Sequence, residues 1–335
     1  MTRRLSEVAR RVGVSDATVS RVLNGKPGVS DATRQAVLTA VDVLGYERPT
    51  QLRGVRARLV GLVLPELQNP IFPALAEVAG GALVQLGYTP VLCTRTAGGL
   101  TEAEYVAMLL DQHVSGVIFC GGLTETEHAA LLKRGVPVVL LNAAVDYPGF
   151  PRVSTDDAAA VRQAYAHLTA MGHTDIGLMV GPEHHMPSRR KLAAFTRLTS
   201  GSGAHHPVGH ALFSFEGGQA VAAELLSAGA TALICGSDVL ALGAIRAARR
   251  RGLTVPGDLS VVGYDDSAFM NYTDPPLTTL RQPIEAMSRA AVTLLVNQIS
   301  GENPTPQELL HEPELVVRNS TAPPLVTRLG AARGA

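Results

Sequence analysis

The stretch LSEVARRVGVSDATVSRVLNG, residues 5–25, predicts two short amphipathic helices joined at a glycine turn. The first helix is indicated by apolar side chains spaced i, i+3, i+4 and i+7, namely Leu5, Val8, Ala9 and Val12. Gly13 follows them where a helix commonly ends, and Ser15 is a good N-cap for the second helix. Because small polar residues and Arg21 remain on the outer face, the layout is typical of a helix-turn-helix that reads the DNA major groove.

Charge separates DNA binding from other uses of a small three-helix bundle, such as a protein-binding module. A third helix, capped by Ser30 and running to about Leu44, would complete such a bundle. Residues 1–58 contain eleven Lys and Arg against five Asp and Glu, a net charge of +6. Since the whole chain has a net charge of zero, the remainder carries −6. A basic head favours phosphate contacts, and an acidic body disfavours non-specific DNA binding elsewhere.

Composition predicts a cytoplasmic protein with a large buried core. The 335 residues suffice for one small and one large domain, and 46% of them are hydrophobic. The chain opens without the apolar stretch of a signal peptide, and no apolar run reaches the roughly 18 residues of a membrane span. Three cysteines without CxxC spacing are expected to be buried apolar side chains rather than a disulfide framework or zinc site; they are Cys93, Cys120 and Cys235.

Beyond residue 58, short apolar strands alternate with helices. Strands are expected at Leu59–Leu64, Thr89–Cys93, Gly116–Cys120, Val136–Leu141, Ile176–Val180, Ala232–Cys235 and Ser260–Gly263. This alternation indicates parallel sheets covered by helices on both faces, and so many units favour two doubly wound lobes. Ligands of open α/β sheets bind beyond the carboxyl ends of the strands. Loops rich in Pro, Asn, Asp and Gly follow those ends, so we expect them to line a cleft.

The residues in these loops favour binding over catalysis. The sequence lacks GxGxxG after a strand, GxxxxGK[ST], HExxH and GxSxG. The histidine clusters are interpreted as loop residues rather than metal ligands; they are His184 with His185, and His205, His206 and His210. Paired aspartates are candidate general acids, yet they are equally suited to accepting hydrogen bonds from sugar hydroxyls. Without a second catalytic signature we favour polyol binding, and we expect neither a metal nor a cofactor.

Ordered motifs along nearly the whole chain resemble the lac-repressor/galactose-repressor (LacI/GalR) family of transcription regulators. They are VSDATVSRVLNG at 14–25, LGY at 44–46 followed by Pro49, QNPIF at 68–72, MGH at 171–173, SDVLALGA at 237–244, VPGDLSVVGYDD at 255–266 and PPLTTLRQP at 275–283. The resemblance implies a small all-α helix-turn-helix headpiece and an α/β body of two periplasmic-binding-protein-like lobes, with doubly wound parallel sheets.

The resemblance also implies a domain division and a function. It places the DNA-binding domain at 1–48, a hinge at 49–58, the effector-binding and dimerisation domain at 59–325 and a tail at 326–335. Lobe 1 would take about 59–155 plus 283–320, and lobe 2 about 156–282. The implied protein is a homodimeric repressor of a near-palindromic operator, controlled by a small molecule. The alternatives are a stand-alone sugar-binding protein and, third, an enzyme on the same body.

The headpiece residues implied to contact DNA divide into two groups. Base reading falls to Asp16, Ala17 and Arg21, of which Arg21 is a natural bidentate partner of guanine. Asp16 accepts a hydrogen bond from a cytosine amino group, caps the start of its helix, or excludes wrong sequences. Positioning contacts are expected from Ser15, Thr18, Ser20 and Asn24, and Leu5 completes the DNA-contacting set.

The hinge departs from the family pattern. A proline, here Pro49, precedes a short helix whose leucine wedges into the minor groove, but Arg56 occupies the leucine position. Either Leu52 or Val55 supplies the wedge in a shifted register, or Arg53 and Arg56 enter a narrow minor groove. A flexible basic linker is the third reading.

The implied effector site combines carboxylates, one aromatic ring and one lysine. Its residues are Pro65, Glu66, Asn69, Phe72, Asp156, Asp157, Lys191, Ser237, Asp238 and Asp265. Phe72 is suited to stack on a sugar ring, and Asp265 to accept hydroxyl protons. Lys191 stands where many sugar-responsive members carry an arginine, which weakens the case for a bidentate clamp. PELQNPIFP at 65–73 and STDD at 154–157 resemble maltose-type members most, which implies maltose or a malto-oligosaccharide as effector.

Overall fold

A computed structural model describes residues 2–23, 28–43, 58–94, 100, 102–121, 125–143, 149–302 and 307–325. The chain divides into two units, residues 1–56 and 57–335. The side chain of Leu5 lies outside the described part, as do Asn24, the tail at 326–335 and the hinge residues Pro49, Leu52, Arg53, Val55 and Arg56. What the sequence predicts for these residues stays a prediction.

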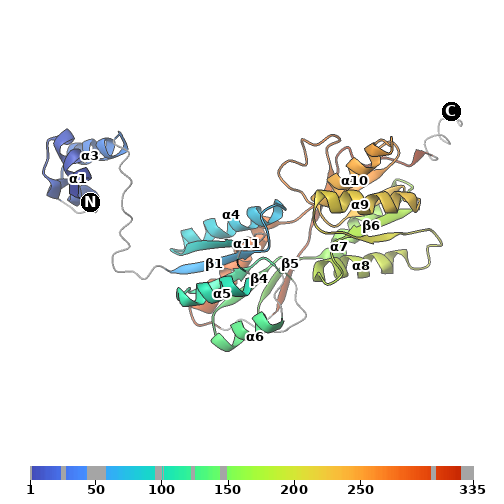
Figure 1. Ribbon diagram of the computed structural model, residues 1–335, viewed down its shortest axis with the longest axis horizontal. Helices are drawn as coiled ribbons and strands as arrows, with labels where there is room; N and C mark the ends of the chain where they lie inside the picture. Colours follow the sequence, from blue (N-terminus) through green and yellow to red (C-terminus); the bar gives the residue numbers. More distant parts are fainter. Residues whose placement is uncertain are drawn as a thin grey trace. The chain divides into compact units, whose positions relative to one another are not determined.

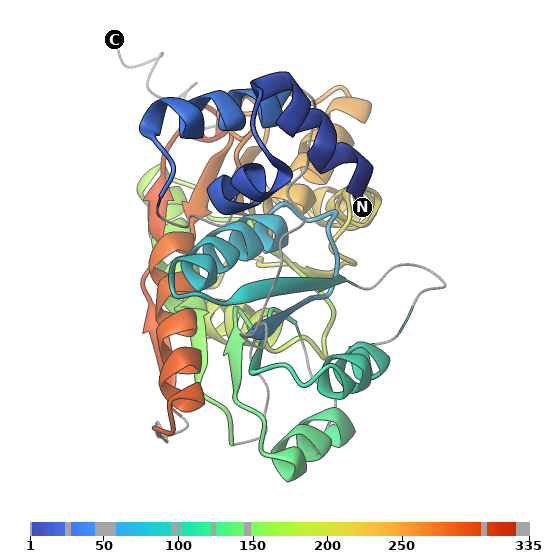
Figure 2. The same cartoon turned by 90° about the vertical axis from the view of Figure 1, so that its left-hand side faces the viewer.

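The N-terminal unit is the predicted helix-turn-helix, drawn in dark blue in Figure 2. It contains α1 (Thr2–Val12), α2 (Asp16–Leu23) and α3 (Asp31–Val43). Gly13 adopts a left-handed φ of 74°, and the Val14 amide donates to the Ala9 carbonyl at 3.0 Å, which closes the turn. The Ser15 hydroxyl accepts from the Thr18 amide at 3.2 Å, which supports its predicted role as N-cap. The helices share a small apolar core of Val8, Ala9, Val19, Val22, Val37, Ala40 and Val41.

The first sheet of the body is six-stranded and parallel throughout. Its order is β11-β5-β4-β3-β1-β2, with strands β1 (Leu59–Leu64), β2 (Thr89–Thr94), β3 (Gly116–Phe119), β4 (Val138–Leu141), β5 (Arg152–Thr155) and β11 (Glu308–His311). One face packs against α4 (Ile71–Gln85) and α11 (Ile284–Ile299), and the other against α5 (Glu102–Asp111) and α6 (Glu125–Arg134) (Figure 1).

The second sheet repeats this plan with one antiparallel edge. Its order is β12-β10-β9-β8-β6-β7, with strands β6 (Ile176–Val180), β7 (Val208–His210), β8 (Ala232–Cys235), β9 (Ser260–Asp265), β10 (Thr278–Arg281) and β12 (Glu314–Val316). One face is covered by α9 (Phe215–Ser227) and α10 (Asp238–Arg250), the other by α7 (Asp157–Ala170) and α8 (Met186–Thr199). Since only β12 runs antiparallel, the predicted pair of doubly wound parallel sheets is confirmed.

The chain passes between the two sheets three times, after β5, after β10 and after β11. The third passage differs from our expectation that 283–320 belongs to lobe 1. β12 pairs with β10, and the Val261 amide donates to the Ser320 carbonyl at 2.8 Å. The first lobe therefore ends at β11, and the segment after His311 returns to the second lobe because it fills the open edge of β10.

The three cysteines are buried, as predicted. None of the helices in the described part of the chain combines the length and apolarity that crossing a bilayer requires.

Candidate functional site

The outer face of α2 is short and polar. Val19 and Val22 are buried in the headpiece core, whereas Ala17, Ser20 and Arg21 are exposed. These three have the spacing i, i+3 and i+4, which places them on one side of the helix. None of these three side chains belongs to the headpiece core. This face of α2 is therefore available to a polar partner.

Side-chain hydrogen bonds stabilise the start of α2. Asp16 Oδ2 accepts a hydrogen bond from Ser6 Oγ at 2.7 Å, which joins α2 to α1, and Ser15 Oγ lies 2.9 Å from Thr18 Oγ1. A carboxylate in the first turn also complements the helix dipole. The contacts support the structural interpretation of Asp16 and leave Arg21 as the charged group of the outer face.

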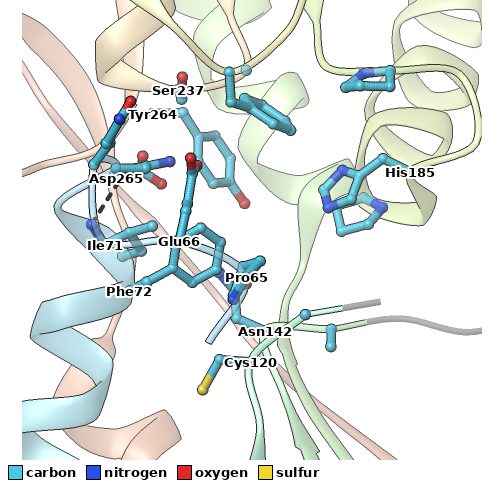
Figure 3. A pocket seen from close by; sticks show the side chains of 18 of the residues that line it. Pro65, Glu66, Ile71, Phe72, Cys120, Asn142, His185, Ser237, Tyr264 and Asp265 are labelled. Carbon is cyan, nitrogen blue, oxygen red and sulfur yellow. Dashed lines mark hydrogen bonds between the residues drawn. The ribbon is translucent and has the colours of Figure 1, made fainter. Parts of the chain in front are cut away.

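A cavity of about 780 Å³ lies where the carboxyl ends of the strands of both sheets meet (Figure 3). The first lobe lines it with the loops that follow β1, β3 and β4 and with the start of α4, which contribute Pro65, Glu66, Asn69, Phe72, Cys120 and Asn142. The second lobe contributes residues after β6, β7, β8 and β10 and at the end of β9, among them His184, His185, Lys191, Phe213, Ser214, Ser237, Tyr264, Asp265 and Gln282. The cleft therefore forms at the edge where open α/β sheets bind ligands.

Asp265 supplies a buried acceptor in this cavity. Only 4% of the residue is exposed, and its Oδ1 accepts from Gln282 Nε2 at 2.7 Å. Its Oδ2 has no partner among the described residues. Its φ of 119° lies in a region that non-glycine residues rarely adopt. Burial, followed by the charge of Asp238, raises the pKa of Asp265 well above its usual value. A buried polar atom without a partner is costly, so a ligand that donates to Oδ2 would be bound favourably.

Asp238 does not line the cavity but holds the loop that carries Asp265. Its Oδ1 accepts from Thr279 Oγ1 at 2.6 Å, and its Oδ2 accepts from the Ser267 amide at 2.7 Å. Burial raises the pKa of Asp238 to about 6. Asp238 therefore positions the loop next to Asp265 from behind the cavity lining, and the predicted contact of Asp238 with the ligand is wrong.

Lys191 faces the cavity with its charge already paired. Its Nζ lies 2.5 Å from Asp157 Oδ1 and 3.9 Å from the centre of the Tyr264 ring. The Tyr264 hydroxyl donates to the same Asp157 oxygen at 2.9 Å. Asp157 is buried behind Lys191 and does not line the cavity. Asp156, also predicted to bind the effector, instead caps α7 by accepting from the Ala159 amide at 2.9 Å.

His184 and His185 lie in the loop before α8, as expected, and this loop also lines the cavity. His185 is half-buried and packs edge-to-face on Phe213 with the ring centres 5.3 Å apart. Burial, together with the charges of Lys191 and His184, lowers the pKa of His185 to about 4, so the imidazole is neutral at pH 7. His206 and His210 contact backbone carbonyls instead. In the part of the chain that is described, no three His, Cys, Asp or Glu residues are grouped as metal ligands.

Seven of the ten predicted effector residues line the cavity: Pro65, Glu66, Asn69, Phe72, Lys191, Ser237 and Asp265. Asp156, Asp157 and Asp238 do not. Asn142 and Tyr264 lie in loops after predicted strands, which were expected to line the cleft, whereas His185, Phe213 and Gln282 were not predicted to line it. Asn142 directly follows Leu141, the end of a predicted strand, whereas Gln282 follows Arg281 of β10, a strand that the sequence did not predict.

Comparisons with known proteins agree with this architecture. Residues 4–49 match the bacterial regulatory proteins of the lacI family, and residues 165–321 match a periplasmic binding protein-like domain. The HTH-type transcriptional regulator MalR of Streptomyces coelicolor is 50% identical, over 96% of this chain and 97% of its own.

Two solved structures extend the likeness. A transcriptional regulator CelR–cellobiose complex matches with a TM-score of 0.72 at 34% identity, over 94% of this chain and 99% of that one. The lac repressor dimer bound to operator and the anti-inducer ONPF matches with a TM-score of 0.72 at 29% identity, over 94% and 98%. The chain belongs to the lacI family of bacterial regulatory proteins and is a DNA-binding transcriptional regulator rather than an enzyme.

Proposed function

We propose that this protein is a repressor that binds a near-palindromic operator as a homodimer and is controlled by a sugar, of the malto-oligosaccharide type, bound in the cavity. The observation that carries the sugar assignment is the unpartnered Oδ2 of Asp265 in a cavity that Phe72 also lines. A carboxyl oxygen accepts hydrogen bonds from sugar hydroxyls, and an aromatic ring packs on the apolar face of a pyranose. The cellobiose bound to CelR supports the same ligand class.

The DNA half of the proposal rests on α2. Arg21 is the exposed cation of its outer face, and a bidentate arginine–guanine contact provides about 1–3 kcal/mol of discrimination. Two such helices in a homodimer would read half-sites about 34–36 Å apart, or a multiple of that distance. The lac repressor dimer bound to its operator supports this arrangement.

Control by a ligand requires that it binds one arrangement of the lobes better than another. The lining of the cavity by both lobes, which three chain passages join, supports this form of control. A sugar that contacts Phe72 on one lobe and Asp265 on the other would change the preferred arrangement. By linkage, operator DNA would change the sugar affinity by the same factor.

Fluorescence anisotropy with labelled DNA from upstream of the gene tests the proposal. We expect salt-sensitive binding to one palindrome and release by one sugar from a panel of oligosaccharides. Arg21→Ala should weaken operator binding by about tenfold or more and leave sugar affinity unchanged. Arg197→Ala, which removes an exposed arginine of the body, is the matched control.

Two outcomes would overturn the proposal. An unchanged operator footprint for Arg21→Ala would refute the role of α2 in base reading. Sugar binding without any specific DNA binding would favour a stand-alone sugar-binding protein.

A further inference from the structure

Two consecutive residues at the end of β9 adopt a backbone conformation that side chains disfavour. Asp265 has a φ of 119° and Asp266 a φ of 58°, a region that non-glycine residues rarely occupy. Such conformations persist only where the surrounding structure holds them. Because Asp265 is the buried acceptor of the cavity (Figure 3), the contacts that hold this turn also decide where its carboxyl group lies.

Asp266 is held through both of its carboxylate oxygens. Its Oδ2 accepts a hydrogen bond from Arg281 Nε at 2.7 Å, and its Oδ1 accepts one from Arg318 Nη2 at 2.7 Å. Only 8% of the Asp266 side chain is exposed, so salt and water screen these bonds little. Asp266 does not line the cavity. Its carboxylate is therefore engaged by protein groups instead of being presented to a ligand.

Arg318 is the better anchored of the two arginines. Its Nη1 donates to the Leu277 carbonyl at 2.7 Å, and its amide donates to Thr278 Oγ1 at 2.9 Å. The Arg318 side chain is 13% exposed, whereas that of Arg281 is 47% exposed and also pairs with the exposed Glu314. Since exposed ion pairs contribute little, we expect the Arg318 contact to dominate.

The segment that carries Arg318 is fixed by the core of the second lobe. Ser320 is fully buried, and its hydroxyl donates to the Val261 carbonyl at 2.6 Å and accepts from the Thr278 amide at 2.8 Å. These bonds place the backbone next to Arg318 without any contribution from Asp266. The guanidinium of Arg318 is therefore a fixed point against which the turn is held.

The residues on either side of Asp266 have partners of their own. Asp265 accepts from Gln282 at 2.7 Å, and the Ser267 amide donates to Asp238 at 2.7 Å. These two contacts hold the ends of the turn, whereas the Arg318 contact holds its middle residue. The middle residue is the one whose left-handed backbone follows directly on that of Asp265.

We propose that Arg318 and Asp266 are positioning residues for ligand binding, because their ion pair holds the backbone that presents the Asp265 carboxyl to the cavity. Without the pair, Asp266 would relax to an ordinary backbone conformation and carry the Asp265 carboxyl out of place. The last passage of the chain between the sheets, which brings Arg318 to the second lobe, thereby becomes part of the binding machinery. This inference rests on the proposed ligand role of Asp265.

Isothermal titration calorimetry of the full-length protein tests the inference, with maltose, cellobiose and maltotriose as probes and the tightest binder used for the variants. Arg318→Met keeps an unbranched side chain without its hydrogen bonds and should weaken binding by about tenfold. Asp266→Asn replaces one acceptor oxygen by a donor that faces an arginine, and its loss should be similar. Arg318→Lys keeps the charge but cannot serve Asp266 and Leu277 together, so it should lose only about threefold.

A double variant and a matched control separate positioning from general damage. Because the two residues act as one pair, Arg318→Met combined with Asp266→Asn should also lose about tenfold rather than about a hundredfold. Arg249→Met breaks another arginine–aspartate pair of the same lobe, Arg249–Asp274, which does not line the cavity, and should leave the affinity within about twofold. Far-ultraviolet circular dichroism of each variant confirms that folded protein is titrated.

The failures are distinguishable. Unchanged sugar affinity in folded Arg318→Met and Asp266→Asn would overturn the positioning role while the proposed sugar function stands. Losses that multiply in the double variant, or an equal loss in Arg249→Met, would also overturn it. If Arg318→Met does not fold, Asp266→Asn decides alone. A wild-type protein that binds none of the three sugars would overturn the proposed function and this inference together.

Discussion

Breaking the buried Lys191–Asp157 ion pair should destabilise the body, and removing both charges should restore much of the loss. Lys191 is 6% exposed and Asp157 5%, so both charges of the pair are largely removed from water. Removing one partner of a buried ion pair leaves the other charge uncompensated, so we expect Asp157→Asn to lower the free energy of unfolding by about 3–5 kcal/mol.

Lys191→Met should cost less, about 3 kcal/mol. The remaining Asp157 keeps the hydrogen bond from the Tyr264 hydroxyl, which offsets part of the loss. The double variant carries no buried charge at this site and should lose only about 1–2 kcal/mol. The cycle therefore predicts a coupling energy of about 4–7 kcal/mol.

Urea unfolding measures the four free energies. The chain has no tryptophan, so far-ultraviolet circular dichroism is the appropriate signal. Glu285→Gln, which breaks the exposed Glu285–Arg289 pair of α11, should cost less than about 0.5 kcal/mol and serves as the control. Additive losses in the double variant, or single losses below about 1 kcal/mol, would refute a charge-paired Lys191.

Three further predictions concern the lobes, the headpiece and pH. Arg190 of α8 donates two hydrogen bonds to Glu308 of β11, at 2.7 and 2.8 Å, so Glu308→Gln should lower the free energy of unfolding by about 1–2 kcal/mol. Arg190→Lys, which cannot pair through two nitrogens, should lose a part of that, and urea unfolding without any loss would contradict a contact between the lobes. Ser15→Ala should destabilise α2 by about 1 kcal/mol and accelerate tryptic cleavage of the headpiece about fivefold, whereas Ser15→Asp, also a good N-cap, should not; equal rates for all three proteins would contradict the cap. His185 stays neutral in the folded chain because its pKa is lowered to about 4, while the unfolded chain takes up the proton near pH 6.5. Wild type should therefore lose up to about 3 kcal/mol of stability between pH 6.5 and 4 that His185→Gln retains. The Asp238 carboxyl, whose pKa is raised to about 6, has the opposite dependence in both proteins, so identical pH profiles would contradict the assignment.

Local patterns predicted the headpiece and the central strands. The spacing of Val8, Ala9 and Val12 and the cap at Ser15 depend on residues within one or two helical turns. The seven expected strands are short apolar runs, which are readable without knowing their neighbours. The missed strands β5, β7, β10, β11 and β12 are only three or four residues long. Their extended form depends on pairing across the chain, as between Glu308 and Arg152 in β11 and β5.

The same difference between local patterns and contacts across the chain explains which site residues could be predicted. Residues that follow a strand, such as Pro65 and Ser237, could be placed because parallel strands end at one edge. Asp157 and Asp238 were selected for their acidity, yet their burial is set by the packing of α7 and α10, which sequence periodicity does not resolve. The environment of His185 was missed for a related reason, since Phe213, which covers it, comes from a different strand end.

The three passages between the sheets also set the order in which the protein can be completed during synthesis. Neither lobe is a contiguous segment. The first sheet closes with β11, and Met287, Ala291, Val292 and Leu295 of α11 belong to the core on one of its faces. A nascent chain that has emerged only as far as β5 therefore exposes that face, whereas the buried core of the headpiece comes from its own three helices. The ribosome thus releases a potential DNA-binding unit long before the ligand-binding body that controls it can close.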